Sequence, residues 1–261
     1  MKRMNVIAIA IAVTLAVTKL ALLALVLPLF AVHAQAQIVN GGFESGLTGW
    51  TTHGDVSTQG NAQGNIPAGA SKLFITTAGL QADEFDAAGT SIGPFNASGK
   101  SAVLAGVAGG LESLSGNTIG SFDAFGQFAV EGSVASQTFS ALAGNTLSFV
   151  WNFGTRETGL DHAFVVIDGV LTTLNRAVNP TAPGSANDLF QTSYQSFSSS
   201  FTRSGSHTIT FGVVDLTDTA VRSSLSIDQV QISAVPEADV RLMMLAGLGS
   251  LAWLMKRRKS A

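Results

Sequence analysis

Cysteine is absent from this chain of 261 residues, and tyrosine occurs only once. Without cysteine the chain has neither a disulfide framework nor a thiol nucleophile. Charged residues make up only 12% of the sequence. Stability must therefore come from a buried core, and the chain is long enough to form one.

Basic residues are scarce between Gln37 and Ala234. Six of them stand against fifteen acidic residues, so this part of the chain carries a net charge of −9. Binding to nucleic acid needs clustered lysine and arginine to neutralise phosphates, and this class of partner is excluded. A negative surface suits a soluble surface protein or one that gathers cations. The six basic residues are Lys72, Lys100, Arg156, Arg176, Arg203 and Arg222.

Familiar catalytic signatures are also missing. No H-E-x-x-H or other metal-ligand spacing occurs, and there is no G-x-S-x-G nucleophile turn. Gly106–Gly110 is glycine-rich but lacks the Lys-Ser/Thr pair of a phosphate-binding loop. The three histidines between residues 37 and 234 stand too far apart for such a spacing and are His53, His162 and His207.

One acidic pair resembles catalytic chemistry more closely. Glu157 and Asp161 could serve as the acid and base of a glycosidase if their carboxyl groups lay about 5–9.5 Å apart. Acidic loops on a negative surface are more commonly solvated or bind cations. We therefore expect a protein that is not an enzyme, and keep a secreted glycoside hydrolase as the least favoured alternative.

The N-terminus has the three parts of a secretory signal peptide. Met1-Lys2-Arg3 is a basic start, Val6–Leu27 is a mostly apolar run, and Ala34-Gln35-Ala36 is a small-residue cleavage site after Ala34 or Ala36. The alternative is an uncleaved anchor, since the apolar run exceeds the usual ~7–15 residues. Lys19 favours cleavage because a charge at mid-bilayer is costly.

The C-terminus has a second three-part pattern. Val235, Pro236 and Glu237 form a short polar motif, Leu242–Met255 is an uncharged apolar segment, and Lys256, Arg257 and Arg258 begin a basic stop. The apolar segment predicts a membrane-inserted helix, although a relaxed span needs about 20 residues. The alternative is an amphipathic helix of a soluble domain, but no polar residues occur at helical spacing. Basic flanks at both ends of the chain favour a cytoplasmic side for each terminus and export of everything between them.

This C-terminal pattern resembles the PEP-CTERM sorting signal of Gram-negative bacteria. The resemblance covers about the last 27 residues, and it departs from the family where Ala238 replaces the second proline. It implies that an exosortase, a membrane peptidase, recognises the segment and cleaves near Pro236 and Glu237. The chain would then be the substrate of that enzyme, located in the envelope, at the cell surface or in the extracellular matrix.

Between the two ends, residues 37–234 predict one all-β domain. Short runs of alternating polarity are bounded by turn residues, which is typical of an antiparallel two-sheet sandwich of the jelly-roll kind. We expect hairpins at Ala143-Gly144-Asn145 and at Asp168-Gly169. Gly54–Gly69 and the Gly/Ser-rich insertion around 96–132 predict loops, low order or edge strands.

The ends of this domain resemble galactose-binding-like and carbohydrate-binding jelly-roll modules. Asn40-Gly41-Gly42-Phe43-Glu44 matches the opening motif, and Ile227-Asp228-Gln229-Val230 matches the closing one. The resemblance implies that the two segments lie together and hold a structural calcium ion, with carboxylates from Glu44 and Asp228. The alternative is that Glu44 caps a turn and Asp228 is solvated.

A second resemblance lies in the middle of the domain. Gln137-Thr138-Phe139, Trp151–Glu157 and Asp161–Gly169 are similar to choice-of-anchor surface domains, which implies an extracellular module. We therefore expect a non-catalytic surface or matrix protein associated with exopolysaccharide or biofilm, with a carbohydrate-binding module as the alternative. Sugar binding would need an exposed aromatic platform, for which the large candidates besides phenylalanine are Trp50, Trp151 and Tyr194.

Overall fold

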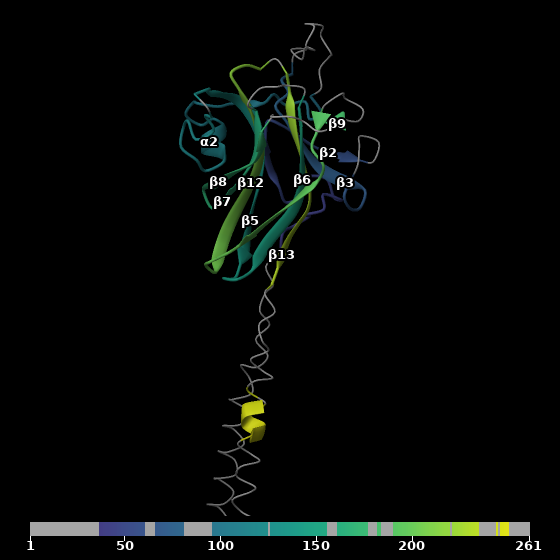
Figure 1. Cartoon of the computed structure of the whole chain (residues 1–261), viewed down its shortest axis with the longest axis vertical. Helices are drawn as coiled ribbons and strands as arrows, with labels where there is room; N and C mark the ends of the chain where they lie inside the picture. Colours follow the sequence, from purple (N-terminus) through teal and green to yellow (C-terminus); the bar gives the residue numbers. More distant parts are fainter. Residues whose placement is uncertain are drawn as a thin grey trace, which may run out of the picture. The chain divides into compact units, whose positions relative to one another are not determined.

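Two antiparallel sheets pack face to face, which confirms the all-β sandwich (Figure 1). One compact unit, Ala36–Val235, contains all of the strands named below. The computed structural model describes residues 37–60, 66–80, 96–124, 126–155, 161–176, 182–183, 190–219, 221–234, 244 and 246–250.

The first sheet is built around two long strands, β5 (Ala129–Ala141) and β12 (Gly205–Leu216). On one side, β5 pairs with the short strands β1 (Thr51–His53) and β4 (Val103–Leu104). On the other, β12 pairs with β7 (His162–Ile167), which pairs with β8 (Val170–Arg176). β7 and β8 form the predicted hairpin, and Asp168 and Gly169 both have positive φ, at 51° and 81°.

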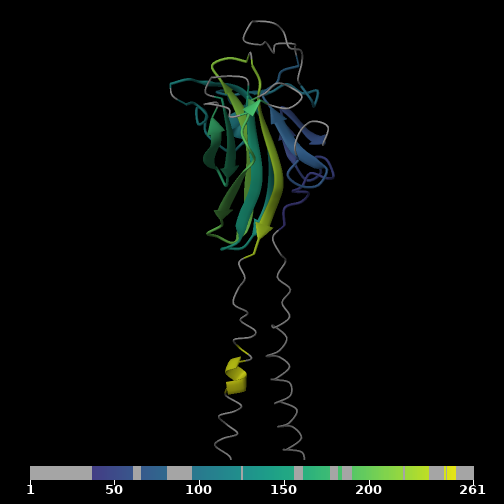
Figure 2. The same ribbon diagram turned by 45° about the vertical axis from the view of Figure 1, so that its right-hand side comes forward.

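The second sheet is built around β6 (Thr146–Thr155) and β13 (Ser223–Ser233), which lie side by side (Figure 2). β13 also pairs with β3 (Ser71–Thr76), which pairs with β2 (Asp55–Gly60). β11 (Gln195–Ser200) and β10 (Phe190–Gln191) both pair with β6, and β9 (Ala182–Pro183) pairs with β10.

The main core lies between the sheets, because alternate residues of each strand point inward. Phe149 of β6 and Phe211 of β12 meet there edge to face, with ring centroids 4.8 Å apart. Trp50 packs on the same Phe211 ring at 5.7 Å. Trp50 is therefore part of the core and not a surface platform.

A second hydrophobic cluster covers the outer face of the first sheet. Phe122 stacks on Phe164 of β7 at 4.3 Å, and Leu111 of the short helix α2 (Leu111–Leu114) is fully buried with them. Figure 1 shows α2 beside β7, β8 and β12. The carboxylate of Glu112 is buried beneath this cover and accepts N–H bonds from Gly106 and Gly120.

Of three loop predictions, one is wrong and two are confirmed in part. The turn at residues 143–145 joins the two sheets instead of closing a hairpin, because β5 pairs with β12 while β6 pairs with β13. Within Gly54–Gly69, β2 is an edge strand of the second sheet, as expected, and pairs along its length with β3, while residues 61–65 lie outside the described residues. Residues 96–132 contain the edge strand β4, as expected, and the start of the central strand β5, while α2 and Phe122 between them belong to the ordered cover.

The predicted C-terminal helix lies mostly outside the described residues. The residues of this segment that the structure describes, Met244 and 246–250, are helical. Among the residues that the structure describes, no helix is both long and apolar enough for a membrane span.

Candidate functional site

The motif Asn40-Gly41-Gly42-Phe43 forms a tight turn against β13. Asn40 and Phe43 adopt positive φ angles of 53° and 57°, and the Asn40 side chain donates to the carbonyl of Gly46 at 2.8 Å. The carbonyl of Gly41 accepts an N–H bond from Val230 at 2.9 Å. The opening and closing motifs of the domain therefore lie together, as the resemblance to jelly-roll modules implies.

Glu44 and Asp228 meet through a shared loop, residues 66–71. Oε1 of Glu44 accepts the N–H groups of Ala70 and Ser71 at 2.8 and 3.2 Å. Oδ2 of Asp228 accepts the N–H of Ala68 at 3.0 Å, and its Oδ1 accepts that of Gln229 at 2.6 Å. Both carboxylates thus fix the loop through its backbone, which is a structural role that needs no metal.

The ammonium group of Lys72 interacts electrostatically with the Asp228 carboxylate. Burial raises the pKa of Asp228 and Glu44 raises it further, while its backbone hydrogen bonds and the charge of Lys72 lower it. Burial lowers the pKa of Lys72, whose ammonium donates to the Tyr194 hydroxyl at 3.2 Å. Burial also raises the pKa of Tyr194 to about 12. A calcium ion here would compete with Lys72 for Asp228, and calcium binding by Glu44 and Asp228 stays a prediction.

The remaining predicted site residues divide into two groups. The aromatic platform is not provided by Trp50 and Trp151, which are buried, and Tyr194 is half-buried against Lys72. The processing residues lie outside the described residues and are Ala34, Ala36, Val235, Pro236, Glu237, Lys256, Arg257 and Arg258.

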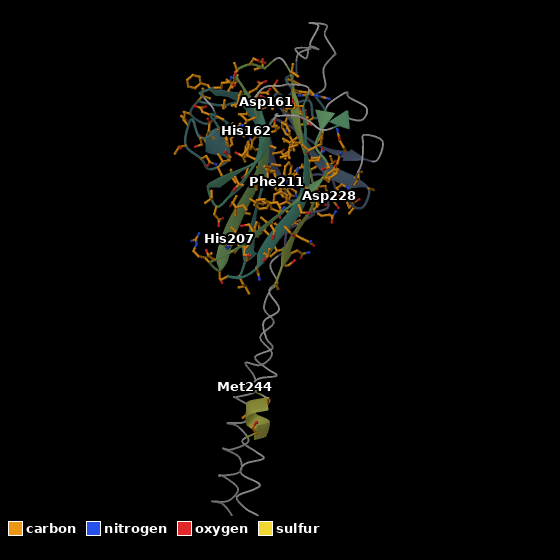
Figure 3. All side chains as sticks on the ribbon, in the orientation of Figure 1. Asp161, His162, His207, Phe211, Asp228 and Met244 are labelled. Carbon is orange, nitrogen blue, oxygen red and sulfur yellow. The ribbon has the colours of Figure 1, made fainter. Side chains whose placement is uncertain are left out.

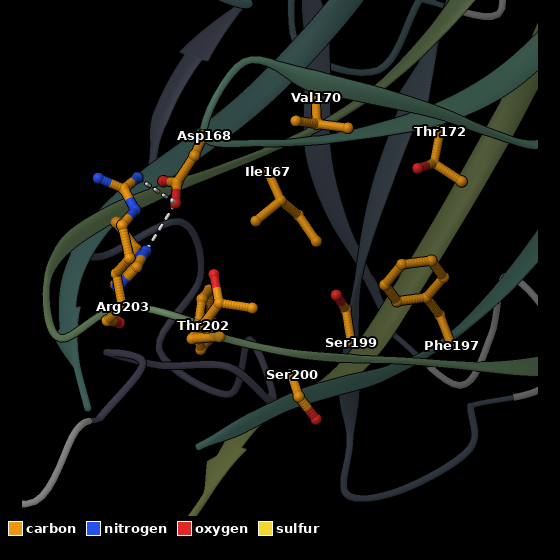
Figure 4. A pocket seen from close by; sticks show the side chains of 11 residues that line it. Ile167, Asp168, Val170, Thr172, Phe197, Ser199, Ser200, Thr202 and Arg203 are labelled. Atoms are coloured by element: carbon orange, nitrogen blue, oxygen red, sulfur yellow. Dashed lines mark hydrogen bonds and ion pairs between the residues drawn. The ribbon is translucent and has the colours of Figure 1, made fainter. Parts of the chain in front are cut away.

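The structure adds a groove that the sequence did not predict. It opens between the β7–β8 hairpin of the first sheet and β11 of the second, with a volume of about 320 Å³ (Figure 4). We call it the edge groove. Figure 4 shows Asp168 and Arg203 toward one end and Phe197 toward the other. The groove is lined by Ile167, Asp168, Val170, Thr172, Phe197, Ser199, Ser200, Phe201, Thr202, Arg203 and His207.

A second groove, the face groove, lies on the outer face of the first sheet beside α2. Its volume is about 480 Å³, and Asp168 lines both grooves. Hydroxyl groups dominate its wall, since it runs along the outward-facing positions of β5 and β12. It is lined by Ser113, Leu114, Ser115, Gly116, Ser136, Val166, Asp168, Gly169, Thr208 and Thr210.

Asp168 is held rigidly between the two grooves. Its Oδ2 lies 2.6 Å from Nδ1 of His207 and 4.0 Å from the Arg203 guanidinium, and its Oδ1 accepts the N–H of Thr208 at 2.9 Å. Burial alone would raise the pKa of Asp168, but the hydrogen bonds with His207 and Thr208 and the nearby positive charges lower it overall. The carboxylate is therefore ionised and fixed, ready to accept hydrogen bonds.

His207 links this carboxylate to the following turn. Its Nδ1 faces Asp168, and its Nε2 lies 3.1 Å from the carbonyl oxygen of Arg203. The turn from Ser200 to His207 and the β7–β8 turn are thereby joined at the end of the edge groove.

No protein-family model matches the chain, and no curated protein is significantly similar to it. Several solved structures align with most of the chain at low similarity. TmCBM61, solved in complex with β-1,4-galactotriose, is 14% identical with a TM-score of 0.40, and the alignment covers 77% of this chain and 100% of that one. The K3 cleaved adhesin domain of Lys-gingipain from Porphyromonas gingivalis is 16% identical with a TM-score of 0.41, at the same coverage. A family 16 carbohydrate-binding module is 11% identical with a TM-score of 0.36, covering 75% of this chain and 98% of that one.

Proposed function

We propose that this protein is an exported, non-catalytic surface or matrix protein whose β-sandwich binds extracellular polysaccharide in the edge groove. The observation that carries the proposal is the lining of that groove. A fixed carboxylate and a guanidinium stand at one end, hydroxyl groups line the wall, and the ring of Phe197 stands toward the other end (Figure 4).

Sugars present hydroxyl groups that both donate and accept hydrogen bonds, and ring faces that are apolar. Asp168 accepts such bonds, Arg203 donates them, and Ser199 and Thr172 do both. Phe197 lies partly exposed while its ring stacks on Phe149 at 4.7 Å, so its position is fixed by the core. The groove combines hydroxyl and charged groups with apolar surface from Ile167, Val170 and Phe197, which complements the two kinds of surface of a sugar.

The lining of the two grooves argues against hydrolysis of a bound sugar. Among the described lining residues, Asp168 is the sole carboxylate in either groove. Glycoside hydrolysis ordinarily uses two carboxyl groups across one bond. Of the pair considered from the sequence, Asp161 is fully buried and Glu157 lies outside the described residues.

Two serine substitutions on one strand test the groove. Ser199 lines the edge groove, whereas its neighbour Ser198 is exposed and points to the other face of β11. Ser199→Phe should fill the groove and abolish retardation of the full chain in gels that contain galactan, xylan or the host's matrix polysaccharide, while Ser198→Phe should migrate like wild type. If none of these polymers retards the wild type, or both variants lose binding equally, the proposal is wrong.

Export and sorting rest on the two terminal segments, both outside the described residues. We propose that the signal is removed after Ala34 or Ala36 and that an exosortase-type peptidase processes the chain near Pro236 and Glu237. Mass spectrometry of the mature protein from its native host should show mass lost at both ends. An intact C-terminus would instead mean that the segment stays as a tail anchor.

A further inference from the structure

The inward-facing side chains along five strands are apolar through the core. At one end of the sandwich, the last inward-facing side chain of each strand carries an oxygen atom instead. Along each strand the apolar alternation of the core continues until the last inward position, which carries a carboxylate or a hydroxyl. Figure 3 shows this end at Asp161, with Phe211 in the middle of the core and His207 toward the other end. We call these five residues the oxygen cluster: Thr77 after β3, Thr155 of β6, Asp161 before β7, Asp215 of β12 and Ser223 of β13.

The oxygen cluster is closely connected. Ser223 Oγ lies 2.7 Å from Oδ2 of Asp161 and 2.8 Å from the Thr155 hydroxyl, and its N–H donates to the Thr77 hydroxyl at 2.9 Å. The other oxygen of Asp161 accepts the N–H of Leu216 at 3.0 Å. All five members are at most 2% exposed. These oxygens therefore face one another inside the protein and not the solvent.

Asp215 is the exception within the cluster. Asp161 and Thr77 lie close enough to act on the pKa of its carboxyl as hydrogen-bond partners, yet neither of its oxygens meets full hydrogen-bond geometry with a described group, and the residue is only 2% exposed. A buried carboxylate without a partner is costly, and removing its hydration is repaid only by hydrogen bonds, a proton or a cation. Asp215 therefore has acceptor capacity that the described residues leave unused.

Two neighbouring acidic side chains increase the free-energy cost of burying the Asp215 carboxylate. Asp161 lies beside Asp215, and Glu131 is its direct cross-strand neighbour on β5. Burial and both of these acidic groups raise the pKa of Asp215 well above its ordinary value. His162 and Arg222 are buried next to Asp161 and Ser223 along the chain and make contacts of their own.

We propose that the oxygen cluster binds a calcium ion between Asp161 and Asp215, closing that end of the core. Calcium takes six to eight hard oxygen ligands, with carboxylates and neutral oxygens combined. Two carboxylates and three hydroxyls supply that chemistry, and a divalent ion would neutralise the buried negative pair. No cluster of three or more His, Asp or Glu side chains occurs among the described residues, so the hydroxyls are essential to the site.

Asp215→Asn is the decisive variant because it keeps the shape of the side chain and removes its charge. In the full chain solubilised in mild detergent at pH 7.5, we expect wild type to bind calcium, measured by isothermal titration and by metal analysis after gel filtration, and to melt at a higher temperature with calcium than with EGTA. Asp215→Asn should lose one bound calcium per chain and the corresponding melting shift. With EGTA it should melt at or above wild type, since Asp161 no longer faces a second buried carboxylate.

Two controls separate this site from others. Asp228→Asn removes the carboxylate at the separate Glu44–Asp228 pair and should keep the calcium that Asp215→Asn loses. Ser223→Ala, which removes only a hydroxyl, should weaken the same binding and serves if Asp215→Asn does not fold. A proton in place of the ion is the rival outcome: wild type would bind no calcium, and its melting temperature would rise from pH 7.5 to pH 5 equally in calcium and in EGTA. That result, or calcium binding unchanged by Asp215→Asn, would overturn the proposal.

Discussion

Gly41 shows how a single residue sets the contact between the first turn and the last strand. A Cβ atom at position 41 would lie 1.9 Å from the carbonyl oxygen of Val230, and backbone cannot move aside cheaply. Gly41→Ala should therefore destabilise the fold by about 1–3 kcal/mol, the usual cost of overpacking. Urea unfolding of both variants measures this. Gly42→Ala is the matched control, since its nearest neighbour would be 4.0 Å away; equal losses would contradict the close-approach explanation.

Asp168 gives a prediction about pH. Its pKa in the folded protein is lowered from 3.8, so its ionised form stabilises the fold above the pKa of the unfolded chain. That contribution is lost as the pH falls through the folded-state value. Asp168→Asn should cost about 1.5–3 kcal/mol at pH 7, as expected for hydrogen bonds to a charged group, and progressively less as the pH falls below 3.8 and through the folded-state pKa. Unfolding free energies measured from pH 2.5 to 7 would show a constant difference if the carboxylate charge did not matter.

The Glu44–Asp228 pair carries the calcium prediction from the sequence. If calcium binds there, chelation should lower the melting temperature, and Asp228→Ala should remove that part of the shift. Lys72 offers the matched test, because Lys72→Met removes the competing ammonium beside Asp228 and should strengthen calcium binding at this pair. A melting shift that is absent in wild type, or unaltered by Asp228→Ala, would remove calcium from this site.

At the scale of elements, the cover over the first sheet depends on Glu112. Its buried carboxylate accepts N–H bonds from Gly106 at 3.0 Å and from Gly120 at 3.3 Å. Glu112→Ala leaves these donors without their partner, which should cost about 1–3 kcal/mol. Hydrogen exchange should quicken across residues 104–124 while β6 and β13 stay protected. Ile119→Ser, at a side chain 57% exposed, is the control and should change neither.

Strands were predictable from the sequence where alternation and turn chemistry agreed. The β7–β8 hairpin follows from Asp168-Gly169, because both residues tolerate the positive φ angles of a type I′ turn. The turn at residues 143–145 has equally suitable residues, yet its two strands enter different sheets. A turn motif fixes the local reversal of the chain, while the pairing partner is chosen by strands far away in sequence.

At the scale of the whole domain, the two sheets share one hydrophobic core. Phe211 contacts Trp50 from the first turn and Phe149 from the second sheet. Phe211→Ala should cost about 3–5 kcal/mol, the usual range for a buried phenylalanine, and both sheets should unfold in one transition. Far- and near-ultraviolet circular dichroism during urea unfolding would test this. Phe128→Ala, at a ring 74% exposed, should leave the midpoint unchanged, and two separate transitions would contradict a shared core.

The sequence by itself determined the alternation that makes two half-buried sheets and the two terminal segments that predict export, while the meeting of the Asn40–Glu44 and Ile227–Val230 motifs was implied by the resemblance to jelly-roll modules. Only the tertiary structure decided which polar residues gather. Asp161 and Ser223 are 62 positions apart and hydrogen-bond directly, and Asp168 reaches His207 across 39 positions. Periodicity reports which side of its own strand a residue occupies. It carries no information about the neighbouring strand, and so the oxygen cluster and both grooves appear only once the sheets are assembled.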